Sequence, residues 1–240
     1  MNNLAFRLRF LLDMRIPEDQ MSGKVLTIAQ HKGGAGKTTL SAQIAAALEF
    51  TGAKILVIDV DPQGSLTEWH KIRCQTLGRK NKITLFQTQG WKMMRELPRM
   101  QREFDYIVID TPPHAESEAS IAIRMADLVL MPMQPSPLDV WACAPTIKII
   151  MQEKKPLMLV MNRVPPKSKL NDTIRDKLDG MNISVAKTTL GNRVAFASSI
   201  MQGLGVGEFD PRGLAAFEMT ALLKEIKKHK ALKADLRKAG

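Results

Sequence analysis

The stretch Val25-Leu-Thr-Ile-Ala-Gln-His-Lys-Gly-Gly-Ala-Gly-Lys-Thr-Thr39 leads from an apolar run through a glycine-rich turn into a helix-length segment. Glycines let the backbone curl so tightly that successive N–H groups point at phosphate oxygens. A helix that begins near Gly36 adds the positive end of its dipole. In such a loop Lys37 reaches the β- and γ-phosphates of a nucleotide, and the Thr38 hydroxyl binds Mg²⁺. The stretch therefore predicts a site for ATP or ADP with Mg²⁺.

One position departs from the general pattern G-x-x-x-x-G-K-[ST], because His31 stands where that pattern has its first glycine. The variant Lys-Gly-Gly-x-Gly-Lys-Thr still lies between a strand-like run and a helix-like run. A chance glycine-rich turn is the competing interpretation, and this setting argues against it. The residues expected to contact the nucleotide are Gly33, Gly34, Ala35, Gly36, Lys37, Thr38 and Thr39.

Aspartates end two of the apolar runs that follow the loop. The runs ILVIDVD and YIVID carry Asp59, Asp61 and Asp110. A metal–phosphate site needs carboxylates at the carboxyl ends of neighbouring strands, whereas a single aspartate there can merely cap a turn. We expect Asp110 to join Thr38 in the Mg²⁺ shell through water. Asp61 is expected to orient the attacking water, and Asp59 to support either the metal site or the loop.

Short β-rich runs alternate with helix-length segments along the chain. Several runs are apolar throughout, as expected of strands buried on both faces of a parallel sheet. The alternation predicts an α/β fold with a doubly wound, mostly parallel sheet flanked by helices. The expected strands are 25–29, 55–59, 83–86, 106–110, 128–131, 157–161 and 183–186, and the expected helices include 38–50, 91–102, 138–152 and 169–179.

One domain is expected over residues 21–230, because no Gly/Ser-rich linker or low-complexity tract divides them. The alternating pattern begins only after residue 20, and Met21 reads like a natural start for it. For residues 1–20 the sequence leaves three interpretations: a disordered extension, an amphipathic helix on the surface, or an artefact of start-codon choice. Residues 231–240 are expected to form a basic tail.

The formal net charge of +11 favours a polyanionic partner, either nucleic acid or an acidic membrane surface, although a basic balance can also serve solubility alone. Cys74 and Cys143 make neither a disulfide framework nor a Cys-x-x-Cys metal pair. No run approaches the roughly 20 apolar residues of a membrane span. We therefore expect a cytoplasmic protein without stable membrane association.

Three motifs occur in order: Lys-Gly-Gly-Ala-Gly-Lys-Thr-Thr, Asp-Val-Asp-Pro-Gln-Gly-Ser and Ile-Asp-Thr-Pro-Pro. They resemble those of ParA/MinD-type P-loop ATPases with a deviant Walker A loop, over residues 24–228. Segments 61–69, 134–141 and 192–196 resemble the small, ParF-like branch of the ParA proteins. The resemblance implies a homodimer that forms on ATP binding, in which Lys32 reaches the nucleotide of the partner subunit and takes part in catalysis. Asn162 matches the adenine-contacting position, with a simple turn residue as the alternative.

The resemblance also implies that the ATP-bound dimer binds DNA without sequence preference and associates with the nucleoid. Hydrolysis would be weak alone and stimulated by a ParB- or ParG-like centromere-binding protein or a cargo adaptor. The cargo would be a plasmid, a chromosome or a protein cluster. Arg193 matches a DNA-contacting arginine, but a second basic position falls around Glu218 and Met219 here. The residues that could replace that charge are Lys224, Lys227, Lys228 and Lys230.

Other classes stay open beside this interpretation. A MinD-like membrane-associated regulator needs a C-terminal amphipathic anchor with bulky apolar residues, and the end ALKADLRKAG has two leucines and no aromatic residue. An iron–sulfur reductase needs cysteines placed to share a cluster, and Cys74 and Cys143 lie in unrelated segments. A small-molecule ligase needs a second substrate pocket, which no motif marks.

Overall fold

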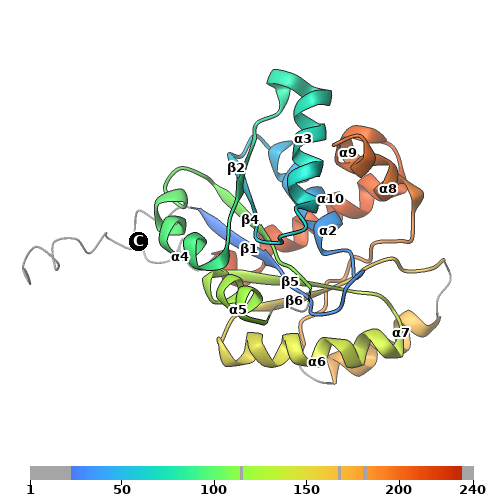
Figure 1. The fold of residues 1–240 in the computed structure, drawn as a ribbon. Coiled ribbons are helices and arrows are strands. Elements are labelled where there is room, and N and C mark those ends of the chain that lie inside the picture. The colour runs from blue at the N-terminus through green and yellow to red at the C-terminus, as the bar shows by residue number, and fades with distance from the viewer. Residues whose placement is uncertain (1–22, 114–115, 167–168, 181–182, 234–240) are drawn as a thin grey trace, which may run out of the picture.

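The computed structural model describes residues 23–113, 116–166, 169–180 and 183–233 (Figure 1). Within these residues six strands form one sheet in the order β3-β2-β4-β1-β5-β6, and every pair is parallel. The doubly wound α/β fold predicted from the sequence is confirmed. The strands are β1 (Lys24–Ile28), β2 (Ile55–Asp59), β3 (Ile83–Gln87), β4 (Tyr106–Asp110), β5 (Leu128–Met133) and β6 (Leu157–Met161).

Helices connect the strands, and the four helices that the sequence predicted are confirmed with ends shifted by no more than two residues. The predicted extension at residues 1–20 and the end of the predicted basic tail lie outside the described residues. The helical elements are α2 (Lys37–Glu49), α3 (Ser65–Leu77), the short 3-10 turn η2 (Gly78–Lys80), α4 (Gly90–Met100), α5 (Glu116–Met125), α6 (Pro137–Gln152), α7 (Lys169–Asp179), α8 (Val194–Met201), α9 (Val206–Phe209), α10 (Leu214–Lys228) and α11 (Lys230–Lys233).

The helices cover both faces of the sheet (Figure 1). Side chains alternate across the pleat of a strand, so neighbouring residues of β1 face opposite cores. Leu26 and Ile28 pack under α2, α3, α8, α9 and α10, whereas Val25 packs on the opposite face with α4 and α5. On that second face α6 and α7 cover β5 and β6. Burial on both faces explains why the strands are apolar throughout.

The strand register brings the predicted acidic residues to one edge of the sheet. Asp110 of β4 stands opposite Ile28 of β1 on one side and Asp59 of β2 on the other. Because parallel strands all point the same way, the loops that follow β1, β2 and β4 meet at this carboxyl edge. The fold therefore places the glycine-rich loop beside both aspartate-bearing segments.

The seventh strand predicted at residues 183–186 is wrong. Val185 makes only an isolated parallel bridge with Leu159. Just after it, the backbone N–H groups of Lys187 and Thr188 donate to the Glu225 carboxylate of α10, at 2.7 and 2.8 Å. Since a side chain satisfies these donors, the segment does not continue as a ladder beside β6.

Candidate nucleotide-binding site

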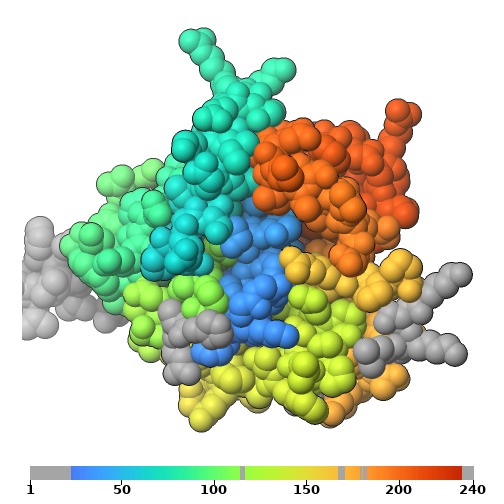
Figure 2. Space-filling view, turned by 45° about the vertical axis from the view of Figure 1, so that its right-hand side comes forward, coloured from blue at the N-terminus to red at the C-terminus, as the bar shows by residue number. Residues whose placement is uncertain are grey.

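The glycine-rich loop joins β1 to α2, and Figure 2 shows its blue segment at the surface between the teal segment that includes α3 and the yellow-green one that includes α6. Gly34 and Gly36 have φ angles of 76° and 90°, in the region that favours glycine. Gln134 Nε2 donates to the Gly34 carbonyl at 3.2 Å, and Asn162 Nδ2 donates to the Ala35 carbonyl at 2.9 Å. Because these two side chains bind carbonyl groups of the loop, its N–H groups can point toward phosphate oxygens.

Asp110 lies directly beside the first turn of α2, as the sequence predicted. Its Oδ2 accepts a hydrogen bond from Thr38 Oγ1 at 2.7 Å, and its Oδ1 accepts one from Ser41 Oγ at 2.9 Å. Complete burial raises the pKa of Asp110 to about 7, although both hydroxyl groups act in the opposite direction. A buried carboxylate beside a hydroxyl can bind a divalent cation, which would replace the proton. Ser41 was missed, although it lies one helical turn beyond Thr38.

Lys37 occupies the centre of the same edge, with 7% of its surface exposed. Burial lowers the pKa of its ammonium group, while the charges of Asp110 and Asp61 act against this shift. Asp61 is also buried, and its Oδ1 accepts a hydrogen bond from the Gln63 N–H at 2.9 Å. The structure thus brings together a buried cation and the two carboxylates predicted to serve the metal and the water.

Asp59 holds the loop that follows β2. Its Oδ1 accepts from the Asp61 N–H at 3.1 Å. Its Oδ2 accepts from the N–H and the hydroxyl of Thr67 at 2.9 and 2.8 Å. Oδ1 therefore anchors the loop that follows β2, and Oδ2 anchors the first turn of α3. Of the two roles that the sequence left open for Asp59, these contacts favour support of the loop over direct metal binding.

Lys32 is held by a residue that the sequence interpretation missed. Its Nζ lies 2.9 Å from Asp139 Oδ2, with 38% of the Lys32 side chain exposed but only 5% of the Asp139 side chain. Ser136 caps the helix that carries Asp139, since its hydroxyl accepts from the Asp139 N–H at 3.1 Å. Oδ1 of Asp139 has no hydrogen-bond partner among the described residues. The ion pair therefore holds Lys32 against the N-terminal turn of α6.

The rest of α6 also contacts the chain just before the loop. Thr146 Oγ1 accepts from the His31 N–H at 2.9 Å and donates to Gln30 Oε1 at 3.2 Å. Gln30 Nε2 in turn donates to Cys143 Sγ at 3.0 Å. The contact to position 31 is made by the backbone N–H, so it does not depend on the side chain at that position. Helix α6 thus fixes the entry to the loop at three successive residues.

Asn162 and Arg193, two of the other predicted site residues, have partners within the chain. Asn162 supports the loop through Ala35, and its Oδ1 accepts from the Arg163 N–H at 3.0 Å. Its contact with adenine stays a prediction. Arg193 Nη2 lies 2.6 Å from Glu218 Oε1, which neutralises part of the charge expected to face DNA. The four predicted lysines of α10 and α11 are all exposed.

The residues at this edge fit a nucleotide with Mg²⁺ on physical grounds. A bound anion would offset the cost of burying the charge of the Lys37 ammonium group. A bound cation would do the same for the Asp110 carboxylate. A Cβ at Gly34 would meet no atom within 4 Å, whereas a Cβ at Gly36 would lie 2.5 Å from Asn162 Nδ2, so Gly36 lets the loop pack against Asn162. None of the helices in the described residues is long and apolar enough to cross a bilayer.

Comparison with known proteins bears on this geometry. The family model described as "CobQ/CobB/MinD/ParA nucleotide binding domain" matches residues 26–206. The carboxysome distribution protein A of Halothiobacillus neapolitanus is 28% identical over 208 residues, covering 84% of this chain and 95% of that protein.

Two solved structures share the fold at low sequence identity. An ATP complex of a McdA variant from Cyanothece has a TM-score of 0.71 at 19% identity, covering 88% of this chain and 97% of that one. The septum site-determining protein MinD of Pyrococcus horikoshii, in complex with Mg-ADP, has a TM-score of 0.70 at 17% identity, covering 86% of this chain and 96% of that one. The predicted ligands, ATP or ADP with Mg²⁺, are those found in these neighbours.

Proposed function

Because this chain belongs to the CobQ/CobB/MinD/ParA nucleotide-binding family, we propose that it is a positioning ATPase of the ParA type. In this proposal it dimerises on ATP, binds DNA without sequence preference and moves a cargo over the nucleoid in the cytoplasm. The observation that carries the proposal is the place of Lys32, which lies beside the phosphate loop yet is held away from it by Asp139. The Lys32 side chain is 38% exposed, so a second copy that covered this face could contact it.

The exposed side of α6 supports a second copy as the occupant of this face. Pro137, Leu138, Trp141, Ala144 and Pro145 are all exposed, and Leu138 and Trp141 each expose 65% of their surface. A contiguous apolar strip of this kind marks an interaction surface in a soluble domain. The strip begins beside Asp139, so a partner that covered it would meet Lys32. We propose that ATP joins two such faces, with each Lys32 reaching the nucleotide of the other subunit.

Hydrolysis then follows from the residues of one loop and two strand ends. Lys37 binds the β- and γ-phosphate oxygens and stabilises the charge that develops on them. Thr38 and Asp110 would hold Mg²⁺, which would supply polarisation of the phosphate when bound. Asp61 orients the attacking water, while Asp59 keeps the Asp61 segment anchored on α3. In this proposal Lys32 must leave Asp139 before it can take part in hydrolysis. ATP hydrolysis should therefore be weak in the protein alone and faster with a partner protein.

DNA binding is assigned to the basic end of the chain. The exposed residues are Lys224, Lys227, Lys228 and Lys230. Phosphate neutralisation needs charge but no fixed motif, so these lysines can bind DNA of any sequence. Arg193 contributes less, because Glu218 holds its guanidinium group. The net charge of +11 agrees with such a partner.

The cargo is linked by a second protein, for which we propose a ParB- or ParG-like centromere-binding protein or a cargo adaptor. The name of the Halothiobacillus relative refers to the maintenance of carboxysome distribution. A plasmid, a chromosome or a protein cluster would each fit the proposal. The positioning chemistry is the same for all three, because only the adaptor contacts the cargo.

The decisive experiment measures binding of a random-sequence duplex with ATP, with ADP and without nucleotide, over a series of salt concentrations. We expect binding only with ATP, falling steeply as salt rises. Lys37→Ala should bind neither nucleotide nor DNA, and Lys32→Ala should bind ATP but form no dimer. Affinity for DNA that does not change with ATP would refute the switch.

A further inference from the structure

A groove lies between α2, α9 and α10, which pack together on one face of the sheet (Figure 1). Its buried wall is formed by Ala46 of α2, by Val206 of α9, and by Ala216, Met219 and Leu223 of α10. The alanines are too short to fill the space between the helices, which leaves a volume of about 240 Å³. Sites for drug-sized ligands begin at about 300 Å³, so this groove suits individual inserted side chains better than a whole small molecule.

The polar side chains of the groove use their hydrogen bonds within the chain. Gln43 Oε1 accepts from the Val206 N–H at 2.7 Å, and its Nε2 donates to Ser199 Oγ at 2.9 Å. The Thr220 hydroxyl donates to the Ala216 carbonyl at 2.8 Å. Because these contacts satisfy the donors, the wall favours apolar groups, which gain free energy by leaving water.

Phe50 marks the rim of the groove as an interaction surface. It caps the C-terminus of α2 and exposes 82% of its surface. Its backbone N–H donates to the Ala46 carbonyl at 3.1 Å, so the last turn of α2 fixes the place of the ring. A single exposed apolar residue is ordinary on a soluble protein, but an aromatic ring beside an apolar recess has the composition of a binding hot spot. The rim and the wall together therefore fit an apolar partner surface.

The exposed charge at one end of the groove is positive. Lys224 follows Thr220 by four positions, and Lys227 follows Leu223 by four positions, so both lysines lie on the groove side of α10. Both lysines are exposed, one turn beyond the residues that line the groove. A partner with carboxylates at that end would complement them.

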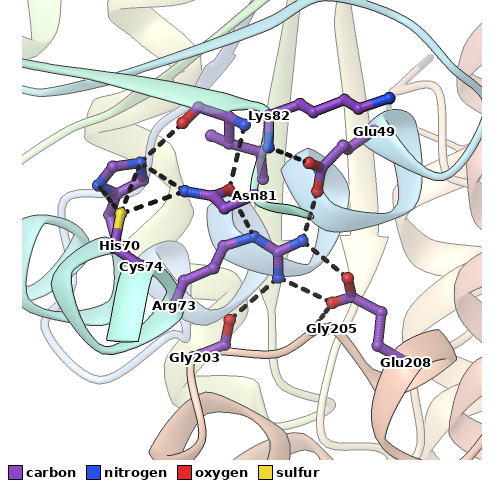
Figure 3. Close-up of polar contacts among 10 residues, drawn as sticks. Glu49, His70, Arg73, Cys74, Asn81, Lys82, Gly203, Gly205 and Glu208 are labelled. Atoms are coloured by element: carbon purple, nitrogen blue, oxygen red, sulfur yellow. Dashed lines mark hydrogen bonds and ion pairs between the residues drawn. The ribbon is translucent and has the colours of Figure 1, made fainter. Parts of the chain in front are cut away.

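The neighbouring carboxylates do not cancel this charge. Glu208 accepts from Arg73 Nη1 and from the Gly205 N–H, each at 2.8 Å (Figure 3). Glu225 is bound by the backbone donors that follow the isolated bridge. Asp210 is exposed, but it lies at the α9 end of the groove. A second copy of the chain would place lysines against lysines, so the charge favours an acidic partner over self-association.

We propose that this groove docks an acidic amphipathic helix of the cargo adaptor. This inference rests on the function proposed above, because it assigns a docking site to that second protein. The helix inserts apolar side chains at positions i, i+3, i+4 and i+7 between α2, α9 and α10, and its carboxylates pair with Lys224 and Lys227. The same two lysines are assigned to DNA, so a docked adaptor weakens DNA binding. Docking therefore couples the capture of cargo to release from DNA.

The first test uses the full chain without nucleotide or DNA and a fluorescein-labelled synthetic peptide. The peptide is a helix of about 16 residues with leucine along one face and glutamate on the others. Anisotropy should show saturable binding that weakens as salt rises, because charge pairs contribute to it. A matched peptide with lysine in place of glutamate should bind about tenfold more weakly. Since nucleotide and DNA are absent, the result does not depend on the proposed ATPase cycle.

Variants test whether the peptide occupies the groove. Phe50→Ala should weaken binding by about thirtyfold, the loss typical of a hot-spot aromatic residue. Met151→Ala is the matched control, because Met151 is 72% exposed at the end of α6, outside the groove. Lys227→Ala should weaken binding by about threefold at low salt, whereas Lys148→Ala on α6 should bind like the wild type. Circular dichroism checks that each variant is folded.

A second measurement adds ATP and a random-sequence duplex. The acidic peptide should displace the duplex from the wild type, and Phe50→Ala should need about thirtyfold more peptide. If the proposed ATPase function fails, no duplex binds and the peptide still does, so the two failures can be told apart. Peptide that binds the groove but leaves the duplex in place would overturn the shared use of the lysines.

Three results would overturn the docking site itself. They are no binding of the acidic peptide up to about 1 mM, equal binding of the acidic and basic peptides, and equal affinities of Phe50→Ala and Met151→Ala. A dimer that forms without nucleotide and is abolished by Phe50→Ala would assign the groove to a second copy, and it would also overturn the proposal.

Discussion

The ion pair between Lys32 and Asp139 offers the sharpest test of the proposed dimer. The change is Asp139→Asn, which keeps the shape of the side chain and removes its charge. If Lys32 leaves Asp139 to reach a partner subunit, the pair stabilises only the separate monomer. Its loss should then make the dimer form more readily, and not less.

The size of this effect follows from the geometry. At an effective dielectric of about 20, unit charges 2.9 Å apart attract by about 6 kcal/mol. Desolvation of the Asp139 carboxylate offsets most of this attraction, leaving about 1.5 to 3 kcal/mol for a charge-assisted hydrogen bond. The asparagine keeps a hydrogen bond to the Lys32 ammonium group, without the attraction between opposite charges, worth about 1 kcal/mol. The net change is about 1.25 kcal/mol per subunit. Since a dimer that engages both lysines breaks two pairs, the total is about 2.5 kcal/mol, or about a seventyfold lower dissociation constant for the dimer.

Analytical ultracentrifugation with a non-hydrolysable ATP analogue would measure that constant. Glu153→Gln is the matched control, because it removes an exposed ion pair with Arg124 just past the other end of the same helix. The control should change neither dimerisation nor stability. An unchanged or weaker dimer in Asp139→Asn, with the monomer still folded, would refute the view that Lys32 is stored in this pair.

Three further predictions concern other parts of the chain. The raised pKa of Asp110, about 7, means that its protonated form stabilises the nucleotide-free protein below about pH 4, and that this contribution is lost as the pH rises through 7. In urea titrations, Asp110→Asn should therefore weaken the dependence of the unfolding free energy on pH over this range. If the variant kept the pH dependence of the wild type, the raised pKa of Asp110 would not be its cause. Arg73 is fully buried between two glutamates, so Arg73→Ala should lower the unfolding free energy by about 3 to 5 kcal/mol in the same assay, and a loss below 1 kcal/mol would show that water replaces the side chain. Lys227→Ala should reduce the slope of DNA affinity against salt concentration by about one phosphate contact, whereas Lys148→Ala on α6 should leave that slope unchanged. Equal slopes for the two variants would show that DNA does not contact Lys227.

Residues whose roles depend on nearby sequence were the ones that could be predicted. The glycines of the phosphate loop and the aspartates at strand ends can be recognised in the sequence, because strand, turn and helix follow each other directly. The proximity of Asp110 and Thr38 could be predicted from the rule that the carboxyl ends of parallel strands share an edge. In the structure, Thr38 Oγ1 lies 2.7 Å from Asp110 Oδ2. The strand prediction failed at residues 183–186, where Glu225 binds the backbone donors that follow the single bridge.

Partners distant in the chain could not be predicted from the pattern. Asp139 lies 107 positions beyond Lys32, and no local motif links the two. Glu218 is 25 positions beyond Arg193, and its position was noted only as a missing basic residue. Arg73 reads as one more charge on an exposed helix, yet the packing of α9 and the turn after α8 buries it completely. Such contacts depend on tertiary packing, which one sequence does not reveal.

The close approach of Gly203 to α3 has a mechanical consequence. A methyl group at position 203 would lie 2.2 Å from the backbone nitrogen of Arg73, so the two backbones touch with no side chain between them. The Arg73 guanidinium group also donates to the Gly203 carbonyl at 3.0 Å (Figure 3). The contact between Arg73 and Gly203 couples α3 to the turn between α8 and α9, so a tilt of α3 would displace that turn.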